Sequence, residues 1–278
     1  MLIKRVNFQD KTVVVTGASS GIGRALAYEF SSVGANVVLG ARRSDELNAV
    51  ASDIVSRGGR AVGVPTDVTR SEDCRALIEK AVEVFGGVDV LICNAGISMR
   101  ALFDEVDLEV LHRLMDVNFW GTVYCVKYAL PYIQQSKGSI VGVSSVAGIH
   151  GLPARAGYSA SNYAMTGFLD TLRVENLRRG VHVMVACPGF TASNVRFAAL
   201  TADGSPQGAT SRNEARMMTA EEVARRIRRG VERSSRLILM ESEGRLTHLL
   251  KKFVPGVVDR LFYEVMARET DSPLKKTF

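Results

Sequence analysis

Short apolar runs alternate along the chain with longer segments in which apolar residues recur every three or four positions. The runs are rich in valine, isoleucine and leucine, as are parallel strands that are buried on both faces. They lie at residues 11–16, 37–40, 61–64, 88–93, 138–143, 181–186 and 236–240. The segments between them have the period of amphipathic helices. The pattern predicts a single α/β domain, a doubly wound seven-stranded parallel sheet with helices on both faces.

Glycine and proline mark several helix ends in this pattern. Gly34 and the pair at 58–59 are placed to end helices, and Pro131 is expected to kink or shorten the long helix predicted over 108–135. Apolar residues at helical spacing continue on both sides of Pro255. We expect residues 1–244 to form the domain and residues 245–278 to form a helical extension that packs on the same domain or on a partner.

Composition changes this picture little, since 46% hydrophobic and 23% charged residues are ordinary for a globular chain of 278 residues. The net charge of +6 suits an anionic cofactor but does not by itself indicate nucleic acid. The four cysteines are scattered without a C-x-x-C, which indicates buried thiols rather than a metal site or disulfides. The first residues lack the apolar run of a signal peptide, and no apolar stretch reaches the length of about 18 residues that spans a bilayer. We expect a cytoplasmic protein without a metal.

The turn after the first apolar run, T-G-A-S-S-G-I-G at residues 16–23, carries the first candidate chemistry. Gly17 permits a sharp turn, while Gly21 and Gly23 let the backbone approach a ligand and let the helix pack close to the strand. The free N–H groups and the positive dipole end of the following helix favour an anion such as a diphosphate. A strand before the turn and a helix after it favour dinucleotide binding over a simple chain reversal.

The T-G-x-x-x-G-x-G spacing resembles the classical short-chain dehydrogenase/reductase family, and the resemblance runs from about Phe8 to about Met240. It implies a Rossmann-type fold and hydride transfer between a carbonyl or alcohol substrate and a nicotinamide cofactor. Besides the three glycines of the turn, it implies further cofactor contacts at two sets of positions. They are the turn residues Ser19, Ser20 and Ile22, and the strand-end residues Asp67, Val68, Asn94, Ala95, Gly96, Pro188, Gly189, Thr191 and Ser193.

These strand-end residues match separate motifs of the family. Asp67 and Val68 resemble the pair at the adenine ring, although Asp67 also suits a turn or a helix N-cap. Residues 94–96 match the N-A-G motif that borders the cofactor and steadies the central sheet. The segment from Pro188 resembles P-G-x-x-x-T, which holds the nicotinamide carboxamide. Ser193 takes the threonine place there, and Thr191 is a second candidate.

The end of the second strand bears on the choice between NAD(H) and NADP(H). In NAD-binding relatives an acidic residue stands there and holds the ribose hydroxyls. In this chain Arg42 and Arg43 stand there instead, and guanidinium groups suit a 2′-phosphate. We therefore expect NADP(H), with Ser19 as a helper. The alternative is that both arginines are solvated loop charges.

Hydride transfer to a carbonyl needs a proton donor at the carbonyl oxygen, and a tyrosine with a pKa of about 10 is a poor base near neutral pH. The family places a lysine four residues after the tyrosine, where a helix brings both to one face and the cation lowers the tyrosine pKa. By this resemblance Tyr158 is the acid/base and Ser145, rather than Ser144, binds the substrate oxygen. Asn118 would bend its helix and hold a water of the proton relay. Without the resemblance, Tyr158 is a packed helix residue and Asn118 a helix-surface residue.

The motif is broken at its last position, because Asn162 stands where the family has the lysine. An asparagine can donate a hydrogen bond to a ribose hydroxyl, but it has no charge with which to lower the pKa of Tyr158. We expect Tyr158 and Asn162 to contact the cofactor and the activity to be impaired. Two accounts are open: an oxidoreductase with an inactivating or relay-altering substitution, or a cofactor-binding sensor or scaffold with little turnover. The surrounding enzyme pattern favours the first.

The remaining expectations concern partners. Residues about 190–218 resemble the mobile lid of the family, and the helices predicted over 108–135 and 157–178 resemble those that build its subunit contacts, so we expect a homodimer or homotetramer. The basic cluster at 225–229 predicts a solvated helix face, with phosphate or acidic lipid as the alternative, and no nucleic-acid binding because aromatic interleaving is missing. His182, among apolar neighbours, is expected to be structural. The apolar extension, with Lys251, Lys252 and Arg260 nearby, leaves a peripheral membrane contact open.

Overall fold

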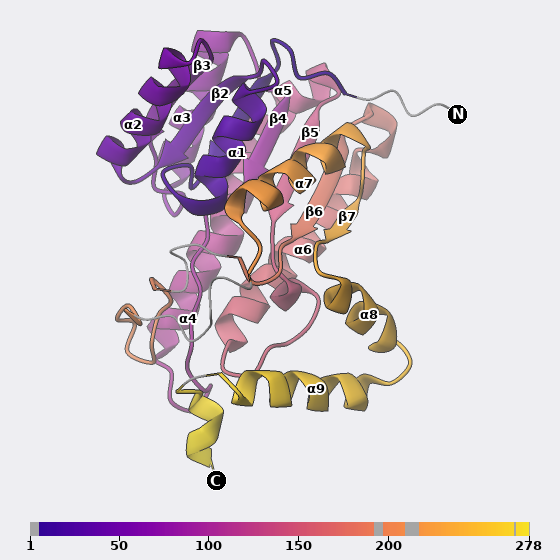
Figure 1. Ribbon diagram of the computed structural model, residues 1–278. Helices are drawn as coiled ribbons and strands as arrows, with labels where there is room; N and C mark the ends of the chain where they lie inside the picture. Colours follow the sequence, from indigo (N-terminus) through magenta and orange to yellow (C-terminus); the bar gives the residue numbers. More distant parts are fainter. Residues whose placement is uncertain (1–5, 192–196, 209–216, 270, 278) are drawn as a thin grey trace.

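The computed structural model describes residues 6–191, 197–208, 217–269 and 271–277 (Figure 1). Seven strands form one sheet in the order β3-β2-β1-β4-β5-β6-β7, and every pairing between neighbours is parallel. The strand order reverses between β1 and β4, which opens a crevice for a ligand at the carboxyl ends of these strands. The predicted doubly wound α/β fold is therefore confirmed.

The strands begin and end within two residues of the expected positions, because each is a short apolar run. The runs of the five inner strands are buried, whereas those of the two edge strands are partly exposed. The strands are β1 (Thr12–Thr16), β2 (Asn36–Ala41), β3 (Arg60–Pro65), β4 (Val90–Cys93), β5 (Ser139–Val143), β6 (His182–Cys187) and β7 (Leu237–Leu239). Successive side chains alternate between the two layers, so Val13 and Val15 pack in one core while Val14 packs in the other.

Helices cover both faces of the sheet (Figure 1). One core is shared by α1 (Gly21–Ser31), α2 (Ser44–Ser56) and α7 (Ala220–Glu232). The other core is shared by α3 (Ser71–Phe85), α5 (Gly121–Ser136) and α6 (Ala156–Glu175). Each helix buries an apolar stripe against the sheet, as its sequence period requires.

The expectation of a solvated basic face on α7 is wrong for two of its arginines. The Arg228 Nε lies 2.6 Å from a carboxylate oxygen of Glu29 on α1, and its guanidinium also pairs with Glu232. Arg226 pairs with Glu222 and donates to the Met240 carbonyl. These arginines tie α7 to α1 and to the end of β7. His182 is likewise engaged, since its ring nitrogens lie 3.1 Å from the Ser139 Oγ and 2.8 Å from the Ser235 carbonyl oxygen.

The long helix before β5 has three parts. The α-helix α4 (Leu108–Leu114) passes into a π-helical segment over Met115–Trp120 and then into α5. Pro131 does not shorten this helix, which continues to Ser136 and ends at Lys137 in the left-handed conformation. The wide turn lies at Asn118, the residue expected to bend the helix.

The C-terminal tail comprises α8 (Ser242–Leu250), α9 (Pro255–Ala267) and a short 3-10 turn over Pro273–Thr277, and it lies at the foot of the domain (Figure 1). Lys251 in this tail donates to the Ile149 carbonyl at 3.1 Å and to the Tyr163 hydroxyl at 2.9 Å. The tail therefore contacts its own domain. Across the described ranges, no helix is both long enough and apolar enough to cross a bilayer.

Candidate active site

The glycine turn between β1 and α1 has the geometry that a diphosphate requires. Gly17 and Gly21 have φ values of +67° and +53°, which favour glycine. A Cβ atom on Gly23 would lie 2.2 Å from the Gly17 carbonyl oxygen, so helix and turn are in direct backbone contact. Ser20, the N-cap residue, gives the first turn of α1 no side-chain cap among the described residues. The N–H groups of that turn are thus left for an anion, and these residues fit a dinucleotide.

The N-A-G motif is bonded to this turn. Asn94 donates its side-chain amide to the Thr16 carbonyl at 2.9 Å, and the backbone N–H groups of Asn94 and Ala95 both donate to the Thr16 hydroxyl at 3.0 Å. A Cβ atom on Gly96 would lie 3.3 Å from the Asn118 Oδ1. These contacts fix the ends of β1 and β4 relative to each other, on the two sides of the crevice.

Of the two arginines after β2, only Arg43 is held over the glycine turn. Its Nη2 donates to the Ser19 Oγ at 3.1 Å and to the Ser20 Oγ at 3.0 Å, and its Nη1 lies 3.0 Å from a Glu46 oxygen. The Arg42 side chain is exposed and bonds to no described residue. Arg43 is therefore the pre-positioned cation beside the turn, whereas Arg42 is exposed and its cofactor contact stays a prediction.

Asp67 is used in a turn that leads into α3. Its carboxylate accepts hydrogen bonds from the Thr69 N–H at 3.0 Å and from the Thr69 hydroxyl at 2.9 Å. Val68 is buried against Gly121, where an added Cβ would lie 2.8 Å from a Val68 methyl group. The turn interpretation of Asp67 thus describes its contacts, while the adenine contact stays a prediction.

Asn118 is buried at the π-helical segment and connects two parts of the site. Its Oδ1 accepts from the Ile97 N–H at 2.8 Å, and its Nδ2 donates to the Ile97 carbonyl at 3.0 Å and to the Ser161 hydroxyl at 2.9 Å. Only 2% of the residue is exposed, which rules out a helix-surface role. Asn118 therefore joins the loop after β4 to the helix that carries Tyr158.

Ser145 and Tyr158 interact at the end of β5. The Ser145 hydroxyl also accepts a hydrogen bond from the Ala147 N–H at 3.2 Å, which holds it in a short turn. Burial raises the pKa of Tyr158 above its ordinary value, and the hydrogen bond with Ser145 and the charge of Arg155 act in the opposite direction. The Tyr158 hydroxyl is therefore favoured in its neutral form, which suits a proton donor.

The Asn162 side chain is used inside the protein. Its Nδ2 donates to the Tyr158 carbonyl at 2.9 Å, one turn earlier in α6, and its Oδ1 accepts from the Ser144 hydroxyl at 3.1 Å. Only 3% of the residue is exposed. Ser144 is thus bonded to the Asn162 side chain, and both Ser145 and, less strongly, Asn162 lower the pKa of Tyr158 through hydrogen bonding. The ribose contact expected of Asn162 is not prepared by these bonds.

The segment after β6 has a partner that the sequence did not reveal. The Phe190 N–H donates to a Glu241 carboxylate oxygen at 2.9 Å, and a Cβ atom on Gly189 would lie 1.8 Å from the Glu241 carboxyl carbon. Glu241 follows β7, and its position after a strand end was the available signal. The Thr191 hydroxyl donates to the Gly189 carbonyl at 3.1 Å, whereas Ser193 lies outside the described residues.

Part of the expected lid over 190–218 is described. Residues 192–196 and 209–216 lie outside the described residues, and residues 197–208 run beside the loop that follows β4. Leu200 pairs with Met99, and both belong to a small apolar cluster on which the Tyr158 ring packs. The wall of the site next to the acid/base candidate is therefore apolar.

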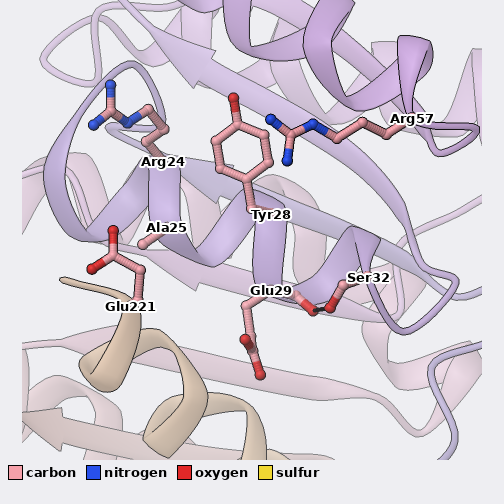
Figure 2. A pocket seen from close by; sticks show the side chains of 7 residues that line it. All are labelled: Arg24, Ala25, Tyr28, Glu29, Ser32, Arg57 and Glu221. Carbon is pink, nitrogen blue, oxygen red and sulfur yellow. Dashed lines mark hydrogen bonds between the residues drawn. The ribbon is translucent and has the colours of Figure 1, made fainter. Parts of the chain in front are cut away.

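A hollow of about 390 Å³ lies beside α1 and contains none of the predicted site residues (Figure 2). The Tyr28 ring stands between the guanidinium groups of Arg24 and Arg57, and the carboxylates of Glu29 and Glu221 lie below the ring in this view (Figure 2). Arg57 is paired with Asp53 at 2.8 Å, and Glu29 is paired with Arg228. Because none of the predicted site residues lines it, the hollow is separate from the site.

Similarity to known proteins covers most of the sequence. Residues 11–203 match the model of a family described as short chain dehydrogenase. The 11-beta-hydroxysteroid dehydrogenase-like 2 protein of Arabidopsis thaliana is 34% identical over 264 residues, which make up 93% of this chain and 83% of the relative. The 11-beta-hydroxysteroid dehydrogenase A of Sesamum indicum is 35% identical over 275 residues, with 96% and 79% covered.

Two solved structures share the fold. A short chain dehydrogenase/reductase from Burkholderia phymatum in complex with NAD superposes with a TM-score of 0.81 and 25% identity, covering 91% of this chain and 96% of that one. An alcohol dehydrogenase from the archaeon Thermococcus sibiricus, complexed with 5-hydroxy-NADP, gives a TM-score of 0.71 and 25% identity, covering 82% and 93%. One neighbour thus holds NAD and the other an NADP derivative.

Proposed function

The chain belongs to the short-chain dehydrogenase family, and on that premise we propose that it is an NADP(H)-dependent oxidoreductase that interconverts a ketone or aldehyde with an alcohol. The observation that supports this proposal best is the arrangement of Ser145 and Tyr158. Ser145, which follows β5, lowers the pKa of Tyr158 in α6 through hydrogen bonding, and Ser145 lies at the same edge of the parallel sheet as the glycine turn after β1. In doubly wound sheets this edge is where ligands bind.

When bound, the nicotinamide supplies or accepts the hydride. The residues of the chain do the rest: Ser145 orients the substrate oxygen, and Tyr158 gives it a proton during reduction. Because burial keeps the Tyr158 hydroxyl protonated, the donor role is the easier of its two roles. In alcohol oxidation Tyr158 must accept a proton, and this direction suffers most from the missing lysine charge.

The preference for NADP(H) rests on Arg43. Its guanidinium is already held beside the glycine turn by the Ser19 and Ser20 hydroxyls. With a 2′-phosphate bound there, the guanidinium would replace these neutral partners by a charge-assisted pair. Dissociation constants for NADPH and NADH at one ionic strength test this. Arg43→Ala should weaken NADPH binding by roughly tenfold to a hundredfold, as expected for a charged hydrogen bond, and leave NADH nearly unchanged. Arg42→Ala is the matched control, and equal affinities of the native protein for the two cofactors would contradict the proposal.

A second function has an observation of its own in its favour. The Asn162 side chain hydrogen-bonds to the Ser144 hydroxyl and to the Tyr158 carbonyl. The residue in the place of the missing lysine is therefore part of the internal hydrogen bonding of the protein. That arrangement also suits a protein that binds the cofactor and turns over little. Loss of NADPH absorbance with a panel of ketones supports the enzyme, whereas tight binding without turnover, even after a lysine is restored at this position, supports the sensor or scaffold.

The ketone panel should include large apolar substrates. The Tyr158 ring packs on a cluster that contains Met99, Leu114 and Leu200. Two of the relatives are named as hydroxysteroid dehydrogenases, and an apolar wall suits a ring system of that kind. We expect ketosteroids to be reduced faster than small charged keto acids at equal concentration.

We also propose that the chain forms a homodimer or homotetramer through the outer surfaces of α5 and α6. Trp120, Val174 and Leu177 are 43%, 58% and 58% exposed near these helices and offer apolar surface that a second copy could cover. Light scattering at micromolar concentration tests this proposal. A monomer would contradict it.

The tail presents a second exposed apolar surface, for which we propose contact with an anionic bilayer. Its members are at least 38% exposed and lie along α8 and α9: Leu246, Leu249, Phe253, Val257, Leu261 and Val265. Lys252, Arg260 and Arg268 are exposed beside them, whereas Lys251 is engaged with Ile149 and Tyr163. Such a mixed surface is typical of interfacial helices. Sedimentation with phosphatidylserine vesicles, but not with phosphatidylcholine vesicles, is expected.

A further inference from the structure

The segment that joins Ser145 to Tyr158 is held by the tail at two places. Within it, Lys251 donates to the Ile149 carbonyl at 3.1 Å, and the Phe262 ring centroid lies 5.0 Å from that of His150. At its end, Arg155 bonds to Glu269. The two groups that interact in the site are thus linked by a segment whose anchors come from the last part of the chain.

Glu269 lies between two arginines and is almost fully buried. One Arg155 nitrogen is 3.0 Å from one oxygen of the Glu269 carboxylate and 3.3 Å from the other, and the Arg100 Nε is 3.5 Å from the first. The exposed fractions of the three side chains are 3% for Glu269, 12% for Arg155 and 8% for Arg100. A carboxylate is rarely buried unless charged partners surround it. Removing it would leave the two arginines as buried positive charges that repel each other and have lost the carboxylate that compensates them.

Three segments of the site meet at this carboxylate. Arg100 belongs to the loop after β4, and its N–H donates to the Leu200 carbonyl at 2.8 Å. The next residue, Ala101, donates to the Ala154 carbonyl at 3.0 Å. Glu269 therefore connects the tail to the loop that follows the N-A-G motif and to the residue that precedes α6.

The segment needs such support because its backbone is strained. Ala154 has a φ of +60°, in the left-handed region that alanine disfavours. Packing gives little help nearby, since a hollow of about 350 Å³ separates residues 151–153 from Phe262. The contact of Arg155 with Glu269 comes directly after the strained residue.

We propose that Glu269 is a positioning residue that holds the Ser145–Tyr158 segment in its reactive arrangement through Arg155 and Arg100. This inference deepens the proposed function and rests on it for the identity of the reaction. Among the described residues, no hydrogen bond or ion pair joins Glu269 directly to Ser145 or Tyr158, and its described partners are Arg155 and Arg100. Its effect travels through Arg155, three residues before Tyr158 in the first turn of α6.

Hydrogen exchange of the full chain tests the positioning without any need for turnover. Glu269→Gln should speed amide exchange in peptides covering 97–102 and 149–159 by about tenfold or more. Glu264→Gln is the matched control, because Glu264 is an exposed carboxylate on the same tail. Exchange that rises only in the tail peptides would overturn the proposal. If Glu269→Gln does not fold, Arg155→Lys provides the same test with the charge retained.

Kinetics in the Asn162→Lys background separate positioning from general stability. Glu269→Gln should lower kcat for ketone reduction about tenfold or more and leave KM for NADPH unchanged, because the tail anchors the tyrosine segment rather than the glycine turn. An unchanged kcat would contradict the proposal. If Asn162→Lys itself shows no turnover, the proposed function fails, and the exchange result still decides whether Glu269 holds the segment.

Discussion

Replacing Asn162 by lysine is the perturbation that tests the site most directly. In the structure the Asn162 side-chain Oδ1 accepts from the Ser144 hydroxyl. Its Nδ2 donates to the backbone carbonyl of Tyr158, one turn away on the same helix. Asn162→Lys removes these two bonds and adds an ammonium group on the face of α6 that Tyr158 shares. It therefore exchanges a neutral packing contact for a cation beside a phenol whose pKa burial has raised.

The size of the effect follows from the spacing. Side chains four apart on a helix lie about 5–6 Å from each other at Cβ. If the ammonium nitrogen comes within about 5–6 Å of the phenol oxygen, the cation stabilises the phenolate by about 3 kcal/mol at an effective dielectric constant of about 20. This equals a fall of about two units in the pKa of Tyr158. The two lost hydrogen bonds cost about 1 kcal/mol each in stability, and desolvation of the ammonium at this buried position adds to that cost.

The assay is a single-turnover measurement at saturating NADPH, because the lysine also changes cofactor affinity. The rate of ketone reduction should rise by roughly 10²–10⁴-fold, the range expected of general acid–base catalysis. In the direction of alcohol oxidation, the pH at which the rate is half-maximal should move toward neutrality, because the tyrosine loses its proton at lower pH. Asn162→Met controls for length without charge, and Tyr158→Phe in the lysine background should abolish the gain.

The reasoning would be refuted by one clear outcome. If the lysine variant binds NADPH and its single-turnover rate stays at the native level across a broad ketone panel, the missing charge is not what limits this site. An equal gain in the methionine control would also contradict the electrostatic argument, because methionine fills similar space without a cation.

Three further predictions follow from single positions. Gly23→Ala should abolish cofactor binding measured by fluorescence titration, since the added Cβ would lie 2.2 Å from the Gly17 carbonyl oxygen. Burial, with a smaller effect from the Lys251 charge, lowers the pKa of His150 to about 4, so the folded state favours the neutral ring. The free energy of unfolding should therefore carry no penalty from His150 above a pH of about 6.5 and should fall as the pH drops toward 4. In His150→Leu the urea midpoint should depend less on pH over this window. Ala154→Gly should raise the free energy of unfolding by roughly 1 kcal/mol, because glycine tolerates the left-handed conformation; a lower midpoint in urea would disprove the strain.

The sheet could be predicted closely because its signals are local. Each strand is a short apolar run bounded by polar or turn residues, and in the five inner strands burial on both faces leaves the run few alternatives. The glycine turn could be predicted equally well, because the positive φ at Gly17 and Gly21 and the close contact at Gly23 require glycine, and glycine stands at all three positions. These features depend on neighbours in the chain.

What the sequence missed depends on neighbours in space. The pairing of Arg228 with Glu29 requires α7 to lie on α1, and the contact of Glu241 with Phe190 requires the ends of β6 and β7 to meet. The bend at Asn118 was expected only from the family resemblance, because its π-helical form leaves no periodic signal in the sequence. In the structure Asn118 bonds to Ile97 and Ser161. The roles of the candidate site residues in binding and reaction stay predictions.

The packing of α7 on α1 has a consequence for synthesis of the chain on the ribosome. These two helices lie side by side although they come from opposite ends of the domain (Figure 1). The apolar side of α1, which contains Leu26 and Phe30, shares one core with Val223 and Ile227. The first βαβ unit therefore emerges long before the helix that covers it. We expect this unit to stay incompletely packed until translation passes Glu232, and to depend on chaperones for protection from aggregation during that interval.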